Sequence, residues 1–418
     1  MPVAALKPKR PPALAPGALD LGVRCPNCNS QGMEIVYAIE NIPVHSTIQL
    51  ADRAKALAFP TGNLKLGYCP ACAFLGNTLY DPHVQAYSTQ CEESQHVSAT
   101  FNKFAHTLAQ RWIDRYRLRN KTILEVGCGK GEFLGLMCEL GDNRGIGIDP
   151  SYQPSRTPPK MAEKMRFIQD LYSEKYTSID ADCIMCRHTL EHIGQTHQFI
   201  AMIRRAIGHR KDIIVLFELP DAVRVLKEPA FWDIYYEHCS YFSPGSLARV
   251  FRANSFDLLE LERDYGDQYL LIAAKPIDPS TDALTQPSLP LENDLQEMAH
   301  TVATFKKTIG PTIEKWRTMI LTAKQKGEKV VIWSALSKAV AFLTTLKIGD
   351  AIEYAIDINP QRHGKFLPIT GQQIMAPDFL HDYRPDHVIL MNPIYTAEVQ
   401  KDLDKMGLNA AIHGVGVA

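Results

Sequence analysis

Three glycines at alternate positions form the sharpest local signal in this 418-residue sequence. Gly127, Gly129 and Gly131 separate an apolar, strand-like run from a helical segment. Glycine lets a backbone turn sharply and brings its N–H groups close to a ligand, although a bare triplet also fits a tight strand–helix turn. The dinucleotide fingerprint Gly-x-Gly-x-x-Gly fails here because position 132 is a glutamate. The acidic Glu125 ahead of the first glycine favours a loop for S-adenosylmethionine (SAM), which has no pyrophosphate to accommodate.

Two further acids extend this predicted donor site. Asp149 ends the second strand-like run, 22 residues after Gly127, where an acid can accept hydrogen bonds from both ribose hydroxyls. Asp170 follows the third run, Arg166–Gln169, where an acid or amide commonly meets adenine. A helix N-cap explains Asp170 equally well. Together with Glu125 and the three glycines, these acids predict a SAM pocket.

Four cysteines form two Cys-x-x-Cys pairs near the N-terminus. The pairs have 40 residues between them and comprise Cys25, Cys28, Cys69 and Cys72. Four thiolates so arranged can close a tetrahedral Zn(II) site, which has no open position for chemistry and holds a small module together. A redox dithiol or buried thiols are the alternatives. Cys183 and Cys186 match the same pattern inside a strand-like run, where residues three apart point to opposite faces, so we expect no metal there.

Histidine and acidic residues gather in two other segments. His188–His192 follows the fourth strand-like run and Phe231–Ser243 follows the fifth. Ligands bind at the carboxyl ends of strands in doubly wound sheets, so both segments should face one cleft. Six aromatic residues beside Asp233, Glu237 and His238 predict an enclosed pocket with a tuned base. A histidine that only closes a hydrogen-bonded turn is the alternative.

Alternating apolar runs predict the scaffold that positions these residues. Strand-like runs lie at 121–126, 145–148, 166–169, 182–186 and 212–218, separated by segments mostly long enough for a helix. This alternation predicts an α/β fold with a parallel, doubly wound sheet. The pair Phe256–Glu262 and Tyr269–Ala274 predicts a hairpin that ends the sheet with a reversed strand. A second, C-terminal Rossmann-like α/β unit has runs at 329–333, 352–358 and 387–391.

The chain divides into five predicted regions. These are a disordered, Pro- and Ala-rich leader (1–20), a cysteine module (21–85), a donor-binding domain (86–275), a Pro-rich linker (276–293), and a long helix with the second α/β unit (294–418). Proline removes a helical hydrogen bond, so the long helix should be interrupted at Gly310-Pro311.

Composition narrows the class of protein. A formal charge of −1 and no clustered basic face argue against a nucleic-acid partner. No stretch approaches the roughly 18–20 apolar residues of a membrane span, and the first residues lack the apolar core of a signal peptide. Cysteine usage fits a reducing cytoplasm rather than a disulfide framework. We therefore expect a cytoplasmic protein that acts on a small molecule, as a monomer or a homodimer.

The sequence resembles the sugar C-methyltransferases of deoxysugar biosynthesis over nearly its full length after the leader. The segments that carry the resemblance are the two cysteine pairs, Glu125–Gly131, His188–Ile193, Tyr235–Ser243, Tyr354–Pro360 and His363–Pro368. The resemblance implies a class I SAM-dependent methyltransferase core. It also implies an N-terminal zinc module and a C-terminal Rossmann-like domain that helps bind a nucleotide sugar.

By resemblance, the acceptor is a nucleotide-linked 4-keto-6-deoxysugar whose keto group acidifies the neighbouring C3 proton. His238 would be the general base that removes this proton, an assistance typically worth about 10²–10⁴ in rate. Tyr235 and Glu237 would position or tune the base, and His188 could stabilise the enolate oxygen. The carbanion would then attack the sulfonium methyl in line, a step that needs no metal.

Two segments depart from the family pattern. Cys91 stands where the family has a tyrosine near the acceptor, although Tyr87 lies close by. The turn after the first C-terminal strand, Ser334–Lys338, has no glycine, and its leucine should crowd a phosphate that approaches the backbone. O- or N-methylation of another small molecule therefore remains an alternative. An NAD-dependent oxidoreductase with Asp357 at the ribose, or a non-catalytic scaffold, would be further alternatives.

Overall fold

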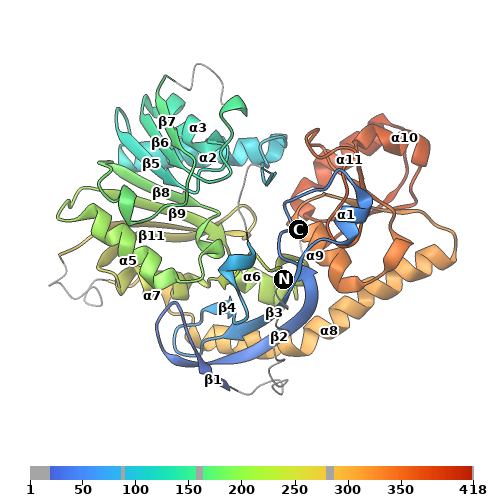
Figure 1. Cartoon of the computed structure of the whole chain (residues 1–418), viewed down its shortest axis with the longest axis horizontal. Coiled ribbons are helices and arrows are strands. Elements are labelled where there is room, and N and C mark those ends of the chain that lie inside the picture. The colour runs from blue at the N-terminus through green and yellow to red at the C-terminus, as the bar shows by residue number, and fades with distance from the viewer. Residues whose placement is uncertain (1–18, 86–89, 157–162, 279–286, 417–418) are drawn as a thin grey trace, which may run out of the picture.

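The computed structural model describes residues 19–85, 90–156, 163–278 and 287–416. Positions 1–18 of the predicted leader, and Tyr87, lie outside the described residues. Three β-sheets organise the chain (Figure 1). The central sheet and the C-terminal α/β unit lie on either side of the molecule, and the N-terminal strands and α8 run beneath them in this view.

The N-terminal module is built on an antiparallel sheet with the strand order β1-β2-β3-β4-β10. Its elements are β1 (Leu19–Arg24), β2 (Gln31–Pro43), α1 (Arg53–Leu57), β3 (Thr61–Tyr68) and β4 (Leu75–Asn77). The last strand, β10 (Ser240–Tyr241), comes from the central domain. Both cysteine pairs occupy turns, after β1 and between β3 and β4. Because β4 pairs with β10, the second cysteine turn is held against the chain that immediately follows His238.

The central sheet has seven strands in the order β11-β12-β9-β8-β5-β6-β7. They are β5 (Thr122–Val126), β6 (Arg144–Ile148), β7 (Met165–Ile168), β8 (Cys183–Arg187), β9 (Ile214–Pro220), β11 (Phe256–Asp264) and β12 (Tyr269–Pro276). Strand β12 runs antiparallel to both β9 and β11, whereas the pairs from β9 to β7 are parallel. The predicted doubly wound sheet with a reversed last strand is therefore confirmed.

Helices cover both faces of this sheet, which is why the inner strands β5, β8, β9 and β12 are buried over almost their whole length. The helices are α2 (Ala99–Tyr116), α3 (Glu132–Gly141), α5 (Thr196–Ile207), α6 (Ala222–Lys227) and α7 (Pro244–Arg252). Within β8, Cys183 packs in the apolar cluster on one face and Cys186 in the cluster on the other. The alternation of strand side chains thus separates this Cys-x-x-Cys pair, as predicted.

The C-terminal unit is a parallel sheet with the order β15-β14-β13-β16-β17. Its elements are β13 (Val330–Trp333), α9 (Ser337–Leu346), β14 (Tyr354–Ile356), β15 (Gln373–Met375), α10 (Leu380–Tyr383), β16 (His387–Leu390), α11 (Thr396–Lys405) and β17 (Ala411–Gly414). The predicted strands correspond to β13, β14 and β16. The edge strands β15 and β17 were not predicted, because they bury few of their residues and therefore lack the continuous apolar run of the inner strands.

The predicted interruption of the long helix is wrong. Helix α8 (Leu295–Gln325) runs for 31 residues straight through Pro311. Gly310 and Pro311 both lie on the exposed face of the helix. The carbonyl that loses its partner to proline, that of Lys307, is on an exposed residue, so solvent can satisfy it. Buried residues on the other face, such as Phe305 and Ile309, hold the helix to the core.

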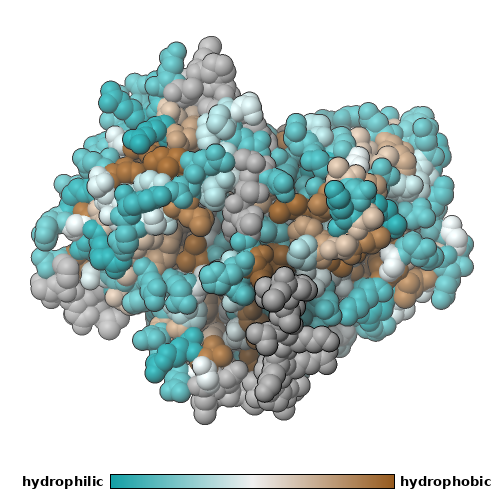
Figure 2. Space-filling model, viewed as in Figure 1, coloured by the Kyte–Doolittle hydropathy of each residue, from teal (hydrophilic) through white to brown (hydrophobic). Residues whose placement is uncertain are grey.

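One apolar cluster joins all three parts of the chain. It includes Leu64 of the N-terminal module, Phe231 of the central domain and Phe342 of α9. The rings of Phe231 and Phe342 stack with their centroids 5.5 Å apart. In Figure 2, apolar surface gathers along the junction between the two halves of the molecule. Among the described residues, no helix has the length and apolar character required to cross a membrane.

Candidate active site

A cavity of about 1350 Å³ lies where the three parts meet. The carboxyl ends of the parallel strands β5, β6, β8, β13 and β16 border it, as expected for doubly wound sheets. The segment Cys91–Ala99, which connects the N-terminal module to α2, also lines it. Every predicted donor and acceptor residue borders this cavity except Gly131.

The glycine loop after β5 takes a backbone conformation that suits glycine. Gly127, Gly129 and Gly131 have φ values of +73°, +54° and +79°. A Cβ added to Gly127 would lie 1.9 Å from the hydroxyl oxygen of Thr189. A Cβ added to Gly131 would lie 2.5 Å from the ring of Phe167. These two glycines are therefore required by both conformation and space.

Asp149 fastens this loop to the end of β6. Its carboxylate accepts hydrogen bonds from the backbone N–H of Gly129 at 2.8 Å and of Ser151 at 2.6 Å. The residue is only half-buried and borders the cavity, so the remaining lone pairs of its oxygens face open space. The ammonium of the neighbouring Lys130 donates hydrogen bonds to the backbone carbonyls of Cys91 and Ser151.

Asp170, two residues after the end of β7, also borders the cavity. It accepts hydrogen bonds from the hydroxyl of Tyr176 at 2.5 Å and from its neighbour's N–H, that of Leu171, at 2.8 Å. Lys175 and Tyr176 lower the pKa of this carboxyl to about 2. Ser173, not Asp170, occupies the N-cap position of the next helical turn. The helix-cap interpretation of Asp170 is therefore wrong.

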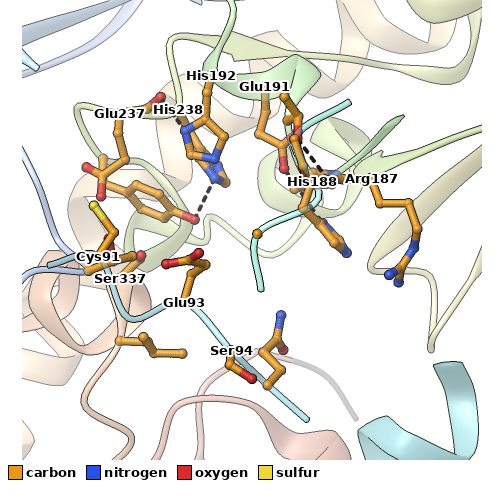
Figure 3. Close-up of a pocket in the computed structure, with 18 of the residues that line it drawn as sticks. Cys91, Glu93, Ser94, Arg187, His188, Glu191, His192, Glu237, His238 and Ser337 are labelled. Carbon is orange, nitrogen blue, oxygen red and sulfur yellow. Dashed lines mark hydrogen bonds and ion pairs between the residues drawn. The ribbon is translucent and has the colours of Figure 1, made fainter. Parts of the chain in front are cut away.

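His238 lies in the inner wall of the cavity (Figure 3). The hydroxyl of Tyr235 is 2.9 Å from its Nε2 atom, and the ring of His192 lies 4.8 Å away between centroids. Burial, reinforced by the neighbouring histidines His192 and His188, holds the pKa of His238 well below its ordinary value. This imidazole is therefore neutral near pH 7 and able to accept a proton.

His188, at the end of β8, has the opposite electrostatic environment. Its Nε2 atom is 2.9 Å from a carboxylate oxygen of Glu218, and its Nδ1 atom is 3.6 Å from Glu191. Burial opposes a charge on the ring, but the two glutamates outweigh it and raise the pKa of His188 to about 9. Among the four histidines that line the cavity, His188 has a raised pKa, whereas burial lowers the pKa of His96, His192 and His238.

Glu237 does not hydrogen-bond to its neighbour His238. Its carboxylate accepts a hydrogen bond at 2.7 Å from the backbone N–H of Ser46, and another from the hydroxyl of the same residue. Burial raises the pKa of this carboxyl to about 7. Glu237 therefore ties the histidine segment to the N-terminal module.

Comparisons with known proteins match both large parts of the chain. Residues 101–261 match the family model described as a methyltransferase domain, and residues 286–411 match a C-methyltransferase C-terminal domain. This chain is a SAM-dependent methyltransferase. It is also similar to the C-methyltransferase NovU of Streptomyces niveus, at 23% identity over 289 residues, which covers 66% of this chain and 67% of the relative. Together these matches support C-methylation.

Solved structures of other methyltransferases match part of the chain. One is 1,6-didemethyltoxoflavin-N1-methyltransferase from Burkholderia thailandensis, with 19% identity over 43% of this chain and 80% of that chain, at a TM-score of 0.34. Another is magnesium protoporphyrin IX methyltransferase from Synechocystis PCC 6803, with 12% identity over 46% and 89%, at a TM-score of 0.35. TM-scores this low carry no argument about the acceptor.

Two charged residues that line the cavity were missed by sequence reasoning. Lys338, in the glycine-free turn, enters the cavity from the C-terminal domain and lies 3.2 Å from a carboxylate oxygen of Asp233. Glu93 enters from the connecting segment, where its carboxylate accepts a hydrogen bond from the hydroxyl of Ser151 at 3.0 Å. Lys338 could have been identified from the sequence, because it is a charged residue in the turn Ser334–Lys338, which departs from the family pattern.

In the glycine-free turn Ser334–Lys338, backbone N–H groups donate hydrogen bonds to side chains of the protein itself. Ser334 has a φ of +135°, and its hydroxyl accepts from the N–H of Leu336. The N–H of Ala335 donates to Asp357 at 2.8 Å. The carboxylate of Asp357 also accepts from Arg362 and from its own downstream loop, so protein donors surround it. This arrangement argues against the NAD interpretation, which needs Asp357 at a ribose.

The four module cysteines come together at one point. The Sγ atoms of Cys25 and Cys72 are 3.6 Å apart, as are those of Cys28 and Cys69. A tetrahedral zinc site with Zn–S bonds near 2.3 Å requires sulfur atoms about 3.8 Å apart. The four thiols, none of them in a disulfide, therefore fit a closed Zn(II) site.

Proposed function

We propose that this methyltransferase transfers the methyl group of SAM to C3 of a nucleotide-linked 4-keto-6-deoxysugar. The observation that carries the proposal is the placement of two histidines in one cavity: His238 lies 2.9 Å from the hydroxyl of Tyr235, and His188 lies between the carboxylates of Glu218 and Glu191. A hydroxyl or amine acceptor would need a base, but only carbon acidified by a ketone also needs a cation for the oxygen of an enolate. The C-methyltransferase matches agree with this choice.

In the proposed reaction, neutral His238 takes the C3 proton, and the electron pair of the broken C–H bond forms an enolate with the 4-keto group. Protonated His188 stabilises the enolate oxygen. C3 then attacks the methyl carbon of SAM, the sulfur–methyl bond breaks, and S-adenosylhomocysteine leaves. Tyr235 holds the imidazole of His238 by its 2.9 Å hydrogen bond, and Glu237 acts at a distance by anchoring this segment to Ser46.

In the same proposal, SAM lies on the loop formed by Gly127, Gly129 and Gly131. Its ribose hydroxyls donate to Asp149, and its adenine lies toward Asp170. This placement directs the methyl group toward the histidines, since donor and acceptor residues line one continuous cavity.

We further propose that the cysteine cluster holds structural Zn(II). Two cysteines of the cluster, Cys69 and Cys72, lie in the turn that leads into β4, and β4 pairs with the strand after His238. The metal would therefore secure the backbone of the acceptor site without entering the reaction. Metal analysis of the purified protein should find one zinc per chain, and Cys69→Ser should lose it. Zinc content that is unaffected by this change would refute the assignment.

The test of the reaction is mass spectrometry with methyl-labelled SAM and a panel of nucleotide-linked 4-keto-6-deoxysugars. The label should appear on a ring carbon, and His238→Ala should lower kcat by about 10²–10⁴ while leaving SAM binding intact. His300→Ala, which changes an exposed histidine of α8, is the matched control. A label on oxygen or nitrogen would replace this proposal with the alternative acceptor class.

The pH dependence gives a second check. His238 has a pKa far below 6.5 and His188 has one near 9, so kcat should stay level between these values. Above about pH 9, His188 loses the proton that stabilises the enolate, and kcat should fall. His188→Gln should lower kcat and remove this high-pH limb. A rate that instead rises through pH 9 would contradict the role of His188.

A further inference from the structure

Three side chains of types that bind metal ions gather in the wall of the cavity (Figure 3). They are Glu191, His192 and His238, and one ligand atom of each lies within 4.8 Å of those of the other two. Among the described residues, the only other group of this kind is the cysteine cluster. The three residues come from the helical turn Leu190–His192 and from the loop before β10, so only the folded chain brings them together.

The carboxylate of Glu191 is buried and only partly paired. The residue is 2% exposed. Its Oε1 atom lies 3.6 Å from Nδ1 of His188, but its Oε2 atom has no hydrogen-bond partner among the described residues. A buried acceptor without a partner is costly, and native proteins rarely retain one without a role. Because Glu191 borders the cavity, a ligand that enters there can satisfy this oxygen.

A backbone carbonyl determines which nitrogen of His192 can bind a metal ion. The Nδ1 atom of His192 lies 3.0 Å from the carbonyl oxygen of Glu237. A carbonyl oxygen can only accept a hydrogen bond, so Nδ1 carries the proton and the lone pair of the neutral ring is on Nε2. Metal-ligating histidines are usually oriented in this way, by a hydrogen bond from the nitrogen that does not bind the metal. His192 therefore has the tautomer and the outer contact of a metal ligand.

Two imidazoles and one carboxylate select the class of ion. This set suits Zn(II) and other divalent first-row transition ions, whereas Mg(II) and Ca(II) prefer oxygen ligands. Zn(II) bonds of about 2.0–2.2 Å require ligand atoms about 3.4 Å apart. From separations no greater than 4.8 Å, each pair of ligand atoms needs to approach by at most about 1.4 Å. The remaining positions around the ion would face the cavity, unlike those of a closed site of four thiolates.

We propose that Glu191, His192 and His238 bind a divalent transition-metal ion such as Zn(II), which blocks the acceptor side of the cavity. A neutral imidazole has one nitrogen lone pair. The bound ion takes the lone pair with which His238 would accept the C3 proton, so the ion and the acceptor exclude each other. This inhibitory role rests on the proposed function, whereas the binding of the metal does not.

Equilibrium dialysis against zinc, without any acceptor, tests the site. Metal analysis of the native protein should find one zinc ion per chain in addition to that of the cysteine cluster, and a weak chelator should remove it first. Glu191→Gln and His192→Ala should each weaken this additional ion by at least about 10- to 100-fold, a loss that even a change outside the ligand shell causes. His300→Ala, which changes an exposed histidine of α8, is the matched control and should retain it.

Cobalt(II) added to the zinc-loaded protein gives a spectroscopic readout of the ligands. Its absorption spectrum should show nitrogen and oxygen ligands without the charge-transfer bands of a thiolate, and His192→Ala should abolish these absorption bands at the same cobalt concentration. No additional ion in the native protein, or one that both variants retain, would overturn the inference.

Steady-state kinetics then test the blocking role. Zinc should inhibit competitively against the acceptor sugar, Mg(II) should not inhibit, and Glu191→Gln should raise the inhibitory zinc concentration about 10- to 100-fold. An additional zinc ion that leaves the rate unchanged would contradict the blocking role. If no sugar of the panel were methylated, the proposed function would fail, whereas the metal site would still be decided by dialysis.

Discussion

The first turn of the central sheet and the first turn of the C-terminal sheet are built on the same plan. In the central sheet, the N–H of Gly129 donates to Asp149 at 2.8 Å, and the N–H two residues after the aspartate donates to its other oxygen. In the C-terminal sheet, the N–H of Ala335 donates to Asp357 at 2.8 Å, and that of Asn359 donates to its other oxygen.

The two turns differ in how exposed each aspartate is and in which other groups contact it. Both aspartates border the cavity, but Asp149 is half-buried, whereas Asp357 is 4% exposed and bears the guanidinium of Arg362 on both oxygens. The same arginine also donates to the carbonyls of Glu92 and Ser94 in the connecting segment. One aspartate is therefore left accessible for the proposed donor site, and the other joins two parts of the chain. Topology alone does not distinguish them.

The largest expected effect is a loss of unfolding free energy on substitution of Asp357, which should distinguish it from Asp149. Asp357→Asn removes the charge opposite buried Arg362, and breaking a buried pair costs about 3–5 kcal/mol of unfolding free energy. Chemical denaturation should show this loss, while the variant's affinity for S-adenosylhomocysteine stays near the native value. If Asp357→Asn weakened donor binding more than Asp149→Asn, the distinction between joint and ligand site would be wrong.

The glycine turn should tolerate no side chain. Gly127→Ala forces a Cβ into a positive-φ position 1.9 Å from Thr189. Conformational strain of about 1–2 kcal/mol and overpacking of about 1–3 kcal/mol should add to about 2–5 kcal/mol. Denaturation and calorimetry together should show a destabilised protein that no longer binds S-adenosylhomocysteine. Native-like donor affinity in this variant would count against the loop as the donor site.

Asp149→Asn should affect the donor more than the fold. The amide can no longer accept with full charge from a ribose hydroxyl, so the affinity for S-adenosylhomocysteine should fall about tenfold. Stability should fall by about 1 kcal/mol, because one of its two backbone hydrogen bonds weakens. Calorimetry and denaturation of the same sample check both values, and a loss of stability as large as that of Asp357→Asn would remove the contrast.

The smallest effect concerns the unusual serine. Ser334 occupies a φ of +135°, a region that glycine tolerates better. Ser334→Gly should relieve this strain, and a net stabilisation of about 0.5–1 kcal/mol remains after the greater flexibility of glycine in the unfolded chain. A thermal melt of the variant beside the native protein measures it. Destabilisation would mean that the hydroxyl's hydrogen bond to Leu336 matters more than the strain.

Local spacing was sufficient to predict much of the fold and to identify residues that line the cavity. Apolar runs located the central strands because their alternation with helices is a property of neighbouring residues. The glycine triplet and Asp149 were predictable for the same reason, since each follows directly from the end of a strand. The break at Pro311 was predicted wrongly because exposure, not propensity, decides whether solvent can satisfy the orphaned carbonyl.

The sequence by itself determined the residue types, their order along each strand and the cysteine spacing that allows four sulfurs to meet. Only the tertiary structure decided the surroundings that shift each pKa and which groups face the cavity. His188 is protonated because Glu218, 30 residues away, lies beside it, and His238 is neutral because three parts of the chain bury it. Glu237 points to Ser46, and Arg362 covers Asp357. Desolvation and pairing depend on neighbours in space, and these neighbours come from segments that the linear sequence holds far apart.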